Sequence, residues 1–385
     1  MICLPGMTKI WAAVPEARVV GGAVRDMLVG RDVADVDFAA PLSPDELMVR
    51  AKKAGLKFIP TGLAHGTITL LAAGRAFEVT SLRRDVETDG RHARVAFTDD
   101  WQEDAARRDF TVNAMSCGQD GKIFDYFGGQ ADLEAGVIRF VGDARQRIVE
   151  DYLRVLRFFR FLARYGQGKP NADAVAGITA ERRGIANLSA ERVWSEIKKI
   201  VQAPAPLPAV MLMQQTGVLE IILPGANPDR LAALLARGAP ADPLLRLAGL
   251  TNEDLAFRLR LSSAEAQSLA EWRRPFALVP EDTDNQVRRA LANTKPDVLL
   301  AQSWLYGGGD ASWASLRARL SKVQVPVFPV LGRDLLALGL QPGAQLGECL
   351  AVLRQWWWEG GCVAQKPECL ARLIDSALLK KREEC

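Results

Sequence analysis

Histidine is scarce in this sequence, which has 385 residues but only two histidines, His65 and His92. Metal centres built mainly from imidazole, such as those of histidine–aspartate phosphohydrolase domains, need more histidines than this. The sequence therefore excludes a histidine-rich metal site. We expect His65 to orient a turn rather than to bind a metal.

Disulfide pairing, membrane spans and a strong net charge are also missing. The six cysteines include no Cys-x-x-Cys pair, and no apolar run reaches the roughly 18 residues that a membrane helix needs. The first twenty residues have no basic segment before a long apolar core, so we expect a cytoplasmic protein with free thiols. Lys and Arg (49) nearly balance Asp and Glu (46), so any binding of nucleic acid must use local basic patches.

The pattern of the chain changes near residue 140. Before it, short β-like runs at 18–20, 33–39, 67–72 and 76–82 alternate with helical stretches such as 44–54. The segment 84–104 is highly charged with little periodicity, which predicts a mobile loop. Beyond residue 140, helical periodicity dominates, for example over 150–164 and 189–201. We expect an α+β fold: a mixed-sheet head (1–140), a helical neck (141–202), and a helical body and tail (203–385).

A glycine turn and a pair of acids carry the strongest chemical signal. An apolar strand runs into Gly21 and Gly22, and a helix pattern follows, which lets backbone approach phosphate oxygens at a helix N-terminus. Asp35 and Asp37 then sit two residues apart, so on a strand both carboxylates project from one face. Carboxylates held close together suit Mg²⁺. Glu78 is either a third acid facing the same metals or a surface strand residue.

Three blocks in this order resemble the class II tRNA nucleotidyltransferases, the CCA-adding enzymes of the polymerase-β-type superfamily. They are Gly-Gly-Ala-Val-Arg-Asp at 21–26, Asp-Val-Asp at 35–37 and Arg-Arg-Asp-Phe-Thr-Val-Asn-Ala-Met at 107–115. Similar blocks follow at 125–129, 150–157, 191–196 and 328–335. The resemblance implies a polymerase-β-like head that adds C, C and A to tRNA from CTP and ATP.

The resemblance also implies roles for particular residues in a two-metal phosphoryl transfer that releases pyrophosphate. It places Mg²⁺ on Asp35 and Asp37, with Glu78 as a further catalytic acid. It places the nucleotide against Gly22, Arg25, Arg108, Asp151, Arg154, Arg157 and Arg160. It implies that tRNA is held by the helical body and tail through its acceptor and T arms, and that the charged loop starting at Arg83 helps to switch from C to A addition.

Asp151 and Arg154 have two readings from spacing alone. In a helix that starts at Glu150 they stand three residues apart on one face, where they form either an ordinary ion pair or a carboxylate–guanidinium edge that reads a base. The resemblance favours base reading, with Glu150 in support. It identifies Glu191, Arg192 and Glu196 as a helix-stabilising motif, which we therefore expect to be structural.

The C-terminal half offers basic pairs beside aromatic residues. These could follow an RNA backbone and stack on bases, or they could be solvated helix faces with tryptophans in the core. The residues concerned are Arg273, Arg274, Arg288, Arg289, Arg317, Arg319 and Trp356 to Trp358.

Other activities remain open at this stage. A bacterial poly(A) polymerase shares the head, but its Gly-Arg-Arg-Phe signature is replaced here by Ala-Gly-Arg-Ala-Phe-Glu at 73–78. A CC-only or A-only enzyme would share every block named above. A catalytically inactive RNA-binding protein would have no need of the Asp35 and Asp37 pair.

Overall fold

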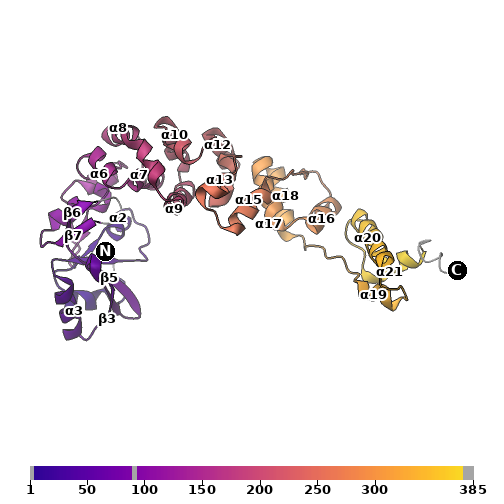
Figure 1. Ribbon diagram of the computed structural model, residues 1–385, viewed down its shortest axis with the longest axis horizontal. Helices are drawn as coiled ribbons and strands as arrows, with labels where there is room; N and C mark the ends of the chain where they lie inside the picture. Colours follow the sequence, from indigo (N-terminus) through magenta and orange to yellow (C-terminus); the bar gives the residue numbers. More distant parts are fainter. Residues whose placement is uncertain (1–3, 89–92, 376–385) are drawn as a thin grey trace. The chain divides into compact units, whose positions relative to one another are not determined.

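The computed structural model describes residues 4–88 and 93–375 (Figure 1). His92 lies outside the described residues. Two compact units emerge from the contacts: unit 1 comprises 1–228 with 257–260, and unit 2 comprises 229–256 with 261–385. Boundaries at residues 140 and 202 stay a prediction.

Unit 1 begins with a mixed seven-stranded sheet in the order β3-β4-β5-β2-β1-β8-β9. The β2–β5 pair is parallel and the other pairs are antiparallel. The strands are β1 (Arg18–Val20), β2 (Asp37–Ala40), β3 (Lys57–Gly62), β4 (Thr67–Ala72), β5 (Arg75–Ser81), β8 (Ser116–Cys117) and β9 (Ile123–Phe124).

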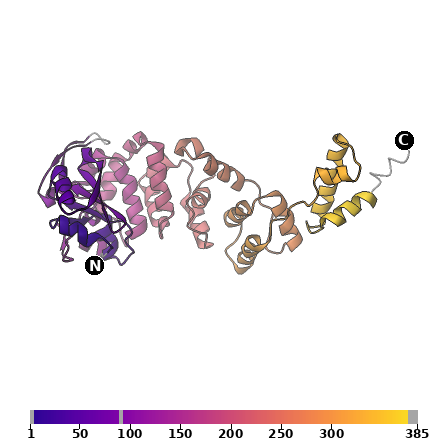
Figure 2. The same cartoon turned by 90° about the horizontal axis from the view of Figure 1, so that it is seen from below.

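Helices cover and extend this sheet within unit 1. In both views the indigo strands stay together and magenta helices follow them along the chain (Figures 1 and 2). They are α1 (Met7–Ala13), α2 (Gly22–Leu28), α3 (Pro44–Lys53), α4 (Trp101–Ala106), α5 (Gly129–Glu134), α6 (Ala144–Glu150), α7 (Leu153–Tyr165), α8 (Ala172–Glu181), α9 (Ala190–Val201), α10 (Pro206–Gln215) and α11 (Val218–Ile222). The predicted α+β class, with a sheet-bearing head and then helices, is confirmed.

Local sequence signals explain several element boundaries. Helix α3 starts where Ser43 and Glu46 exchange hydrogen bonds in a capping box, with Pro44 at its first position. The turn between β4 and β5 places Gly74 at φ 75°, a left-handed conformation that favours glycine. These features agree with the predicted helix at 44–54 and with the break between the predicted strands at 67–72 and 76–82.

The prediction of a mobile loop over 84–104 was wrong. Strand β6 (Arg83–Thr88) pairs with β7 (Ala93–Phe97) in a separate two-stranded antiparallel ribbon, and α4 follows. Backbone pairing in a two-stranded ribbon does not require one apolar face, so the sequence shows no alternation. His65 closes a short 3-10 turn before Gly66, and its carbonyl accepts a hydrogen bond from Arg83 at 2.7 Å.

Unit 2 is helical; no strand is found among its described residues, and Figure 2 shows helices in its orange and yellow segments. Its helices are α13 (Pro243–Leu250), α15 (Ser263–Trp272), α16 (Asp284–Asn293), α17 (Pro296–Tyr306), α18 (Ala311–Lys322), α19 (Gly332–Ala337), α20 (Ala344–Glu359) and α21 (Lys366–Asp375). Helices α12 (Pro228–Ala236) and α14 (Ala256–Leu259) lie at the unit boundary.

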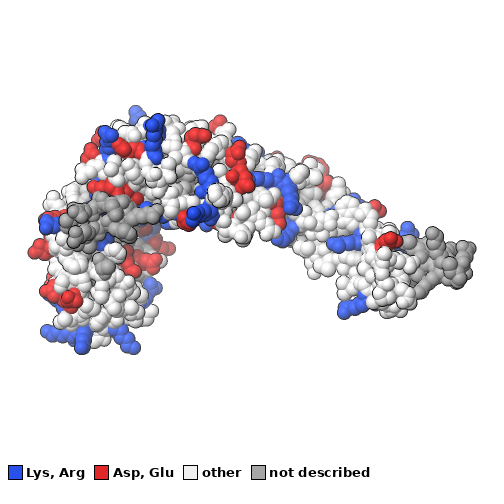
Figure 3. Space-filling model, in the orientation of Figure 1, with Lys and Arg blue, Asp and Glu red and all other residues white. Residues whose placement is uncertain are grey.

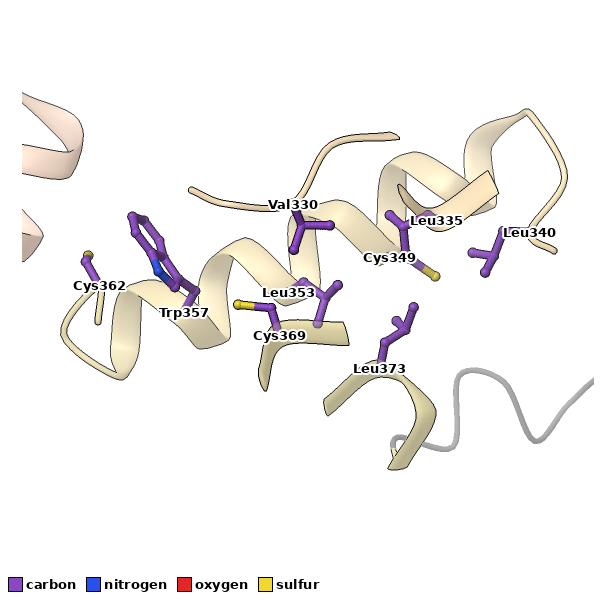
Figure 4. Close-up of a cluster of buried hydrophobic side chains, with 9 residues drawn as sticks. All are labelled: Val330, Leu335, Leu340, Cys349, Leu353, Trp357, Cys362, Cys369 and Leu373. Atoms are coloured by element: carbon purple, nitrogen blue, oxygen red, sulfur yellow. The ribbon is translucent and has the colours of Figure 1, made fainter. Parts of the chain in front are cut away.

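The tryptophans at 356–358 belong to a hydrophobic core rather than to an open stacking surface. Trp357 is buried together with Leu353 and Cys369 in a cluster that α19, α20 and α21 build (Figure 4). Trp356 and Trp358 pack against the same cluster. Burial of these rings accounts for the aromatic run without a nucleic acid.

Most of the basic residues singled out in this half bind backbone carbonyls of unit 2. Arg289 donates to the carbonyl of Trp358, and Arg319 donates to that of Asp282. Arg317 is buried, donates to the carbonyls of Ser303 and Gly308, and stacks 3.5 Å from the ring centroid of Trp304. For these residues, the contacts favour the structural reading. The face drawn in Figure 3 carries both basic and acidic side chains.

Two further features bear on the sequence-based expectations. None of the described helices is both long and apolar enough to cross a membrane. Four buried cysteines of the described ranges, Cys117, Cys349, Cys362 and Cys369, are free thiols, as expected.

Replacing Arg317 tests its structural role. Arg317→Ala should lower the free energy of unfolding by about 2–4 kcal/mol, because one buried and one half-buried carbonyl lose their donor and Trp304 loses its stacking partner. Arg354→Ala, at an exposed position of α20, should have almost no effect. Denaturant unfolding of the full chain, followed by tryptophan fluorescence, measures both variants. Equal stabilities would contradict the structural assignment.

Candidate functional site

The glycine turn forms one wall of the site. Strand β1 ends at Val20, Gly21 takes a left-handed conformation (φ 67°), and α2 starts at Gly22. A Cβ on Gly21 would lie 3.0 Å from a guanidinium nitrogen of Arg108. The positive φ therefore favours glycine, and a side chain here would also crowd Arg108.

The paired acids lie on one side of the sheet, although the predicted strand over 33–39 begins only at Asp37. Val36 and Phe38 are buried while Asp35 and Asp37 are exposed, so burial alternates as on a strand through Asp35. In the parallel β2–β5 pair, Phe38 lies opposite Val79. Asp37 and Glu78 each directly precede this pair, which puts them on neighbouring strands.

The three carboxyl groups influence one another. Partial burial of its carboxyl group raises the pKa of Asp37, although the residue as a whole is exposed; the charges of Glu78 and Asp35 raise it further, and Arg108 opposes them. Such crowding of like charges with hard oxygen donors fits a divalent cation such as Mg²⁺. No group of three or more His, Cys, Asp or Glu side chains suited to a metal is found in the described ranges. The assignment of a metal to Asp35 and Asp37 stays a prediction.

A cavity of about 830 Å³ opens beside this wall within unit 1. All the residues predicted to bind nucleotide line it, together with Asp37, whereas Asp35 and Glu78 do not. These lining residues come from α2, from the segment after α4, from the α6–α7 junction and from α7: Gly22, Arg25, Arg108, Asp151, Arg154, Arg157 and Arg160. The structure thus brings together residues that are up to 138 positions apart in the sequence, from 22 to 160.

Asp109 anchors the floor of the cavity. Its buried carboxylate accepts hydrogen bonds from Asn113 Nδ2 (2.9 Å) and from Arg157 Nε (2.6 Å). Burial alone would raise the pKa of Asp109, but Arg157 and the hydrogen bonds hold it below its ordinary value. Asn113 in turn accepts a hydrogen bond from Arg25. One acid therefore connects guanidiniums of α2 and α7.

Asp151 and Arg154 do not form the predicted pair on one helix face. Helix α6 ends at Glu150, Asp151 is extended, and α7 begins at Leu153. The Asp151 carboxylate accepts the backbone N–H of Leu153 (3.0 Å), a cap-like bond that interrupts the helix. It also pairs with Arg192 (3.0 Å).

Arg154 has a different acidic partner. Its guanidinium donates to Glu150 at 2.6 Å, so an i, i+4 ion pair takes the place of the expected i, i+3 pair with Asp151. Asp151 and Arg154 nevertheless both line the cavity. Within it they present an acceptor and a donor from separately anchored side chains.

Helix α9 supplies further anchors for these groups. Glu196 is buried and accepts a hydrogen bond from Arg160 at 3.0 Å, while Glu191 is exposed and pairs with Arg260 at 2.8 Å. Arg192, which the sequence predicted to be structural, lines the cavity and holds Asp151. The motif at 191–196 therefore contacts the site through Arg192, and its helix-stabilising role stays a prediction.

Several cavity residues were not among those predicted to bind nucleotide. Asp109 and Asn113 belong to the block at 107–115, and that membership was the signal that could have pointed to them. Tyr165 and Lys199 carried none, because each lies at the end of an ordinary amphipathic helix. Their places depend on how α7 and α9 pack beside α2.

Comparison with known proteins identifies the family. Residues 17–139 match the "Poly A polymerase head domain", and 170–230 match the "Probable RNA and SrmB- binding site of polymerase A". CCA tRNA nucleotidyltransferase 1, mitochondrial, of Mus musculus is 36% identical, covering 96% of this chain and 89% of the relative. The CCA-adding enzyme of Levilactobacillus brevis is 30% identical, covering 96% of each chain.

A solved structure shows the same likeness along its whole length. The CCA-adding enzyme of Bacillus stearothermophilus in complex with CTP superposes with a TM-score of 0.73 at 25% identity, covering 100% of both chains. The relatives described above are CCA-adding enzymes, and each matches nearly the whole chain, from the head to the helices that follow it. This chain belongs to the CCA-adding tRNA nucleotidyltransferases.

Proposed function

We propose that this enzyme adds C, C and A to the 3′ end of tRNA, using CTP and ATP and no nucleic-acid template. The observation that carries the proposal is the single cavity in which a glycine turn, Asp37 and the arginines of α7 meet, in a chain related to CCA-adding enzymes along nearly its full length. The 3′-hydroxyl of the RNA attacks the α-phosphorus, and pyrophosphate leaves. A cytoplasmic location suits the free thiols.

Nucleotidyltransferases of this kind generally use a divalent metal. Mg²⁺ is our proposal here, with Asp35 and Asp37 as its carboxylate ligands and Glu78 as a neighbouring acid. When bound, the cation lowers the pKa of the attacking hydroxyl and neutralises charge on the phosphates. The raised pKa of Asp37 without a metal supports this assignment, because a cation would relieve the repulsion.

The arginines hold the triphosphate. Arg25, Arg108, Arg157 and Arg160 line one cavity, and planar guanidiniums match phosphate oxygens in paired hydrogen bonds. Arg25 and Arg157 share the Asp109–Asn113 network. Because carboxylates and amides fix these side chains beforehand, the nucleotide does not have to order them on binding.

The base is read by side chains. The Asp151 carboxylate accepts the exocyclic amino group of cytosine or adenine, and the Arg154 guanidinium donates to the neighbouring ring nitrogen. Uracil and guanine present a carbonyl and an N–H at these places and would leave both side chains unpaired. The separate anchors of the two residues, Arg192 and Glu150, support this role, because each side chain is fixed without consuming the other.

Product sequencing tests the proposed function directly. With tRNA lacking its last three nucleotides, CTP, ATP and Mg²⁺, the enzyme should extend the 3′ end by C, C and A and then stop. Asp35→Ala should bind the same tRNA but add nothing, because the acid serves chemistry and not RNA affinity. A long A tail would indicate a poly(A) polymerase, and a product ending at CC or lacking any C would indicate a partial enzyme.

Asp37 should destabilise the metal-free protein at neutral pH. The pKa of Asp37 is raised on folding, so ionisation of its carboxyl group lowers the free energy of unfolding. This loss of stability is absent below the unfolded-state pKa. It grows as the pH rises toward the folded-state pKa and is complete above that value. Asp37→Asn should therefore have the higher thermal midpoint at neutral pH without metal, and this advantage should disappear in acid.

Added Mg²⁺ completes that experiment. It should raise the midpoint of the wild type and leave that of Asp37→Asn unchanged, because only the former retains both ligands. Asp45→Asn, in the first turn of α3, is the matched control. An equal response of the wild type and Asp37→Asn to Mg²⁺ would place the metal elsewhere.

Arg154→Ala should blur base choice while phosphate binding persists. Loss of one half-buried donor should reduce the preference for CTP over UTP by about 1–3 kcal/mol, or roughly 5- to 150-fold. Relative kcat/KM values for all four nucleotides measure this preference, with Arg145→Ala, an exposed residue of α6, as control. If every nucleotide slows by the same factor, Arg154 supports the helix and does not read the base.

A further inference from the structure

Tyr165, the last residue of α7, is buried at the edge of the cavity between two cations. The guanidinium carbons of Arg25 and Arg31 each lie 4.6 Å from its ring centroid. Phe161, one turn earlier on the same helix, offers a second ring 5.0 Å from Arg25. The flat face of the Arg25 guanidinium is thus supported by aromatic rings.

The hydroxyl group of Tyr165 reaches the acid that binds the edge of Arg25. It donates a hydrogen bond to Asp26 Oδ1 and accepts one from Arg164 Nε at 3.1 Å. The same Asp26 carboxylate accepts from Arg25 Nη2 at 3.1 Å and from Arg25 Nε at 3.2 Å. One side chain of α7 therefore contacts both the face of Arg25 and the carboxylate that fixes its edge.

Arg25 is the group whose orientation matters for the substrate. It is itself buried, and Asn113 accepts a hydrogen bond from its other terminal nitrogen. With its face on Tyr165 and its edge shared by Asp26 and Asn113, the guanidinium has few alternative orientations. Its remaining N–H groups are then available to an anion in the cavity.

We propose that Tyr165 is a positioning residue for nucleotide binding, which acts through Asp26 to hold the Arg25 guanidinium ready for the triphosphate. This inference rests on the proposed function of the cavity. The contacts of Tyr165 do not include the base-reading residues; its partners come from α2, from Arg31 shortly after α2, and from its own helix. It therefore serves CTP and ATP equally.

Tyr165→Phe isolates the hydroxyl group, because the ring against Arg25 and Arg31 is kept. We expect the KM for both CTP and ATP to rise about three- to tenfold, since ordering of Arg25 must now accompany binding. The kcat and the ratio of CTP to UTP incorporation should remain unchanged. Tyr126→Phe is the matched control, because Tyr126 is exposed and outside the cavity lining.

A double-mutant cycle shows whether Tyr165 acts through Arg25. Arg25→Lys should raise KM alone, and adding Tyr165→Phe to it should raise KM little further, because the guanidinium to be positioned is gone. Independent, multiplicative effects of the two substitutions would overturn the proposal. So would an unchanged KM in Tyr165→Phe, or a fall in kcat with KM unaltered.

Binding of CTP without tRNA, measured by calorimetry, separates this inference from the proposed function. Weaker CTP binding by Tyr165→Phe than by the wild type and Tyr126→Phe would support the positioning role even if the wild type failed to make a CCA end. Unchanged CTP binding in an active CCA-adding wild type would overturn the positioning role alone. The thermal midpoints of all variants identify any variant whose KM rises because the protein is partly unfolded.

Discussion

The hydrogen bonds of Asp109 are the constraint on which the cavity depends. This buried acid joins the segment after α4 to Arg157 of α7, and through Asn113 it reaches Arg25 of α2. A buried carboxylate is costly unless its oxygens are satisfied, and here Phe110, Asn113 and Arg157 satisfy them. Asn113 and Arg157 donate from two separate segments, so the cost of burying the Asp109 charge is offset only when both segments are correctly placed.

The remaining cationic wall of the cavity repeats this arrangement. Several of the arginines that line it each pair with a carboxylate. The pairs are Arg25–Asp26, Arg108–Asp104, Arg154–Glu150, Arg157–Asp109, Arg160–Glu196 and Arg192–Asp151. Such pairing lets many positive charges share one cavity while retaining donors for a polyanion. We expect a site built in this way to bind a triphosphate with little reorganisation.

Sequence reasoning predicted the sheet-bearing head, the helix at 44–54 and many of the residues that line the cavity. It failed where tertiary contacts decide local structure. The helix break at Asp151 was missed, because apolar periodicity continues across it and the interrupting bond comes from a side chain. The β6–β7 ribbon was missed, because pairing of backbones leaves no apolar alternation in the sequence.

The sequence also did not predict which group each charged side chain contacts. Arg154 and Asp151 were paired from their spacing, but Glu150 and Arg192 hold them. In the C-terminal half, arginines interpreted as possible RNA contacts bind carbonyls of their own unit. Periodicity shows which face of a helix is buried, but it does not show which acid or carbonyl from elsewhere in the chain meets a given guanidinium.

A diffraction structure of this enzyme with bound CTP tests the central claim most directly. The account predicts a triphosphate against Arg25, Arg108, Arg157 and Arg160, with the cytosine edge on Asp151 and Arg154. Nucleotide bound outside this cavity, or a base held away from Asp151 and Arg154 while the phosphates are in place, would contradict it.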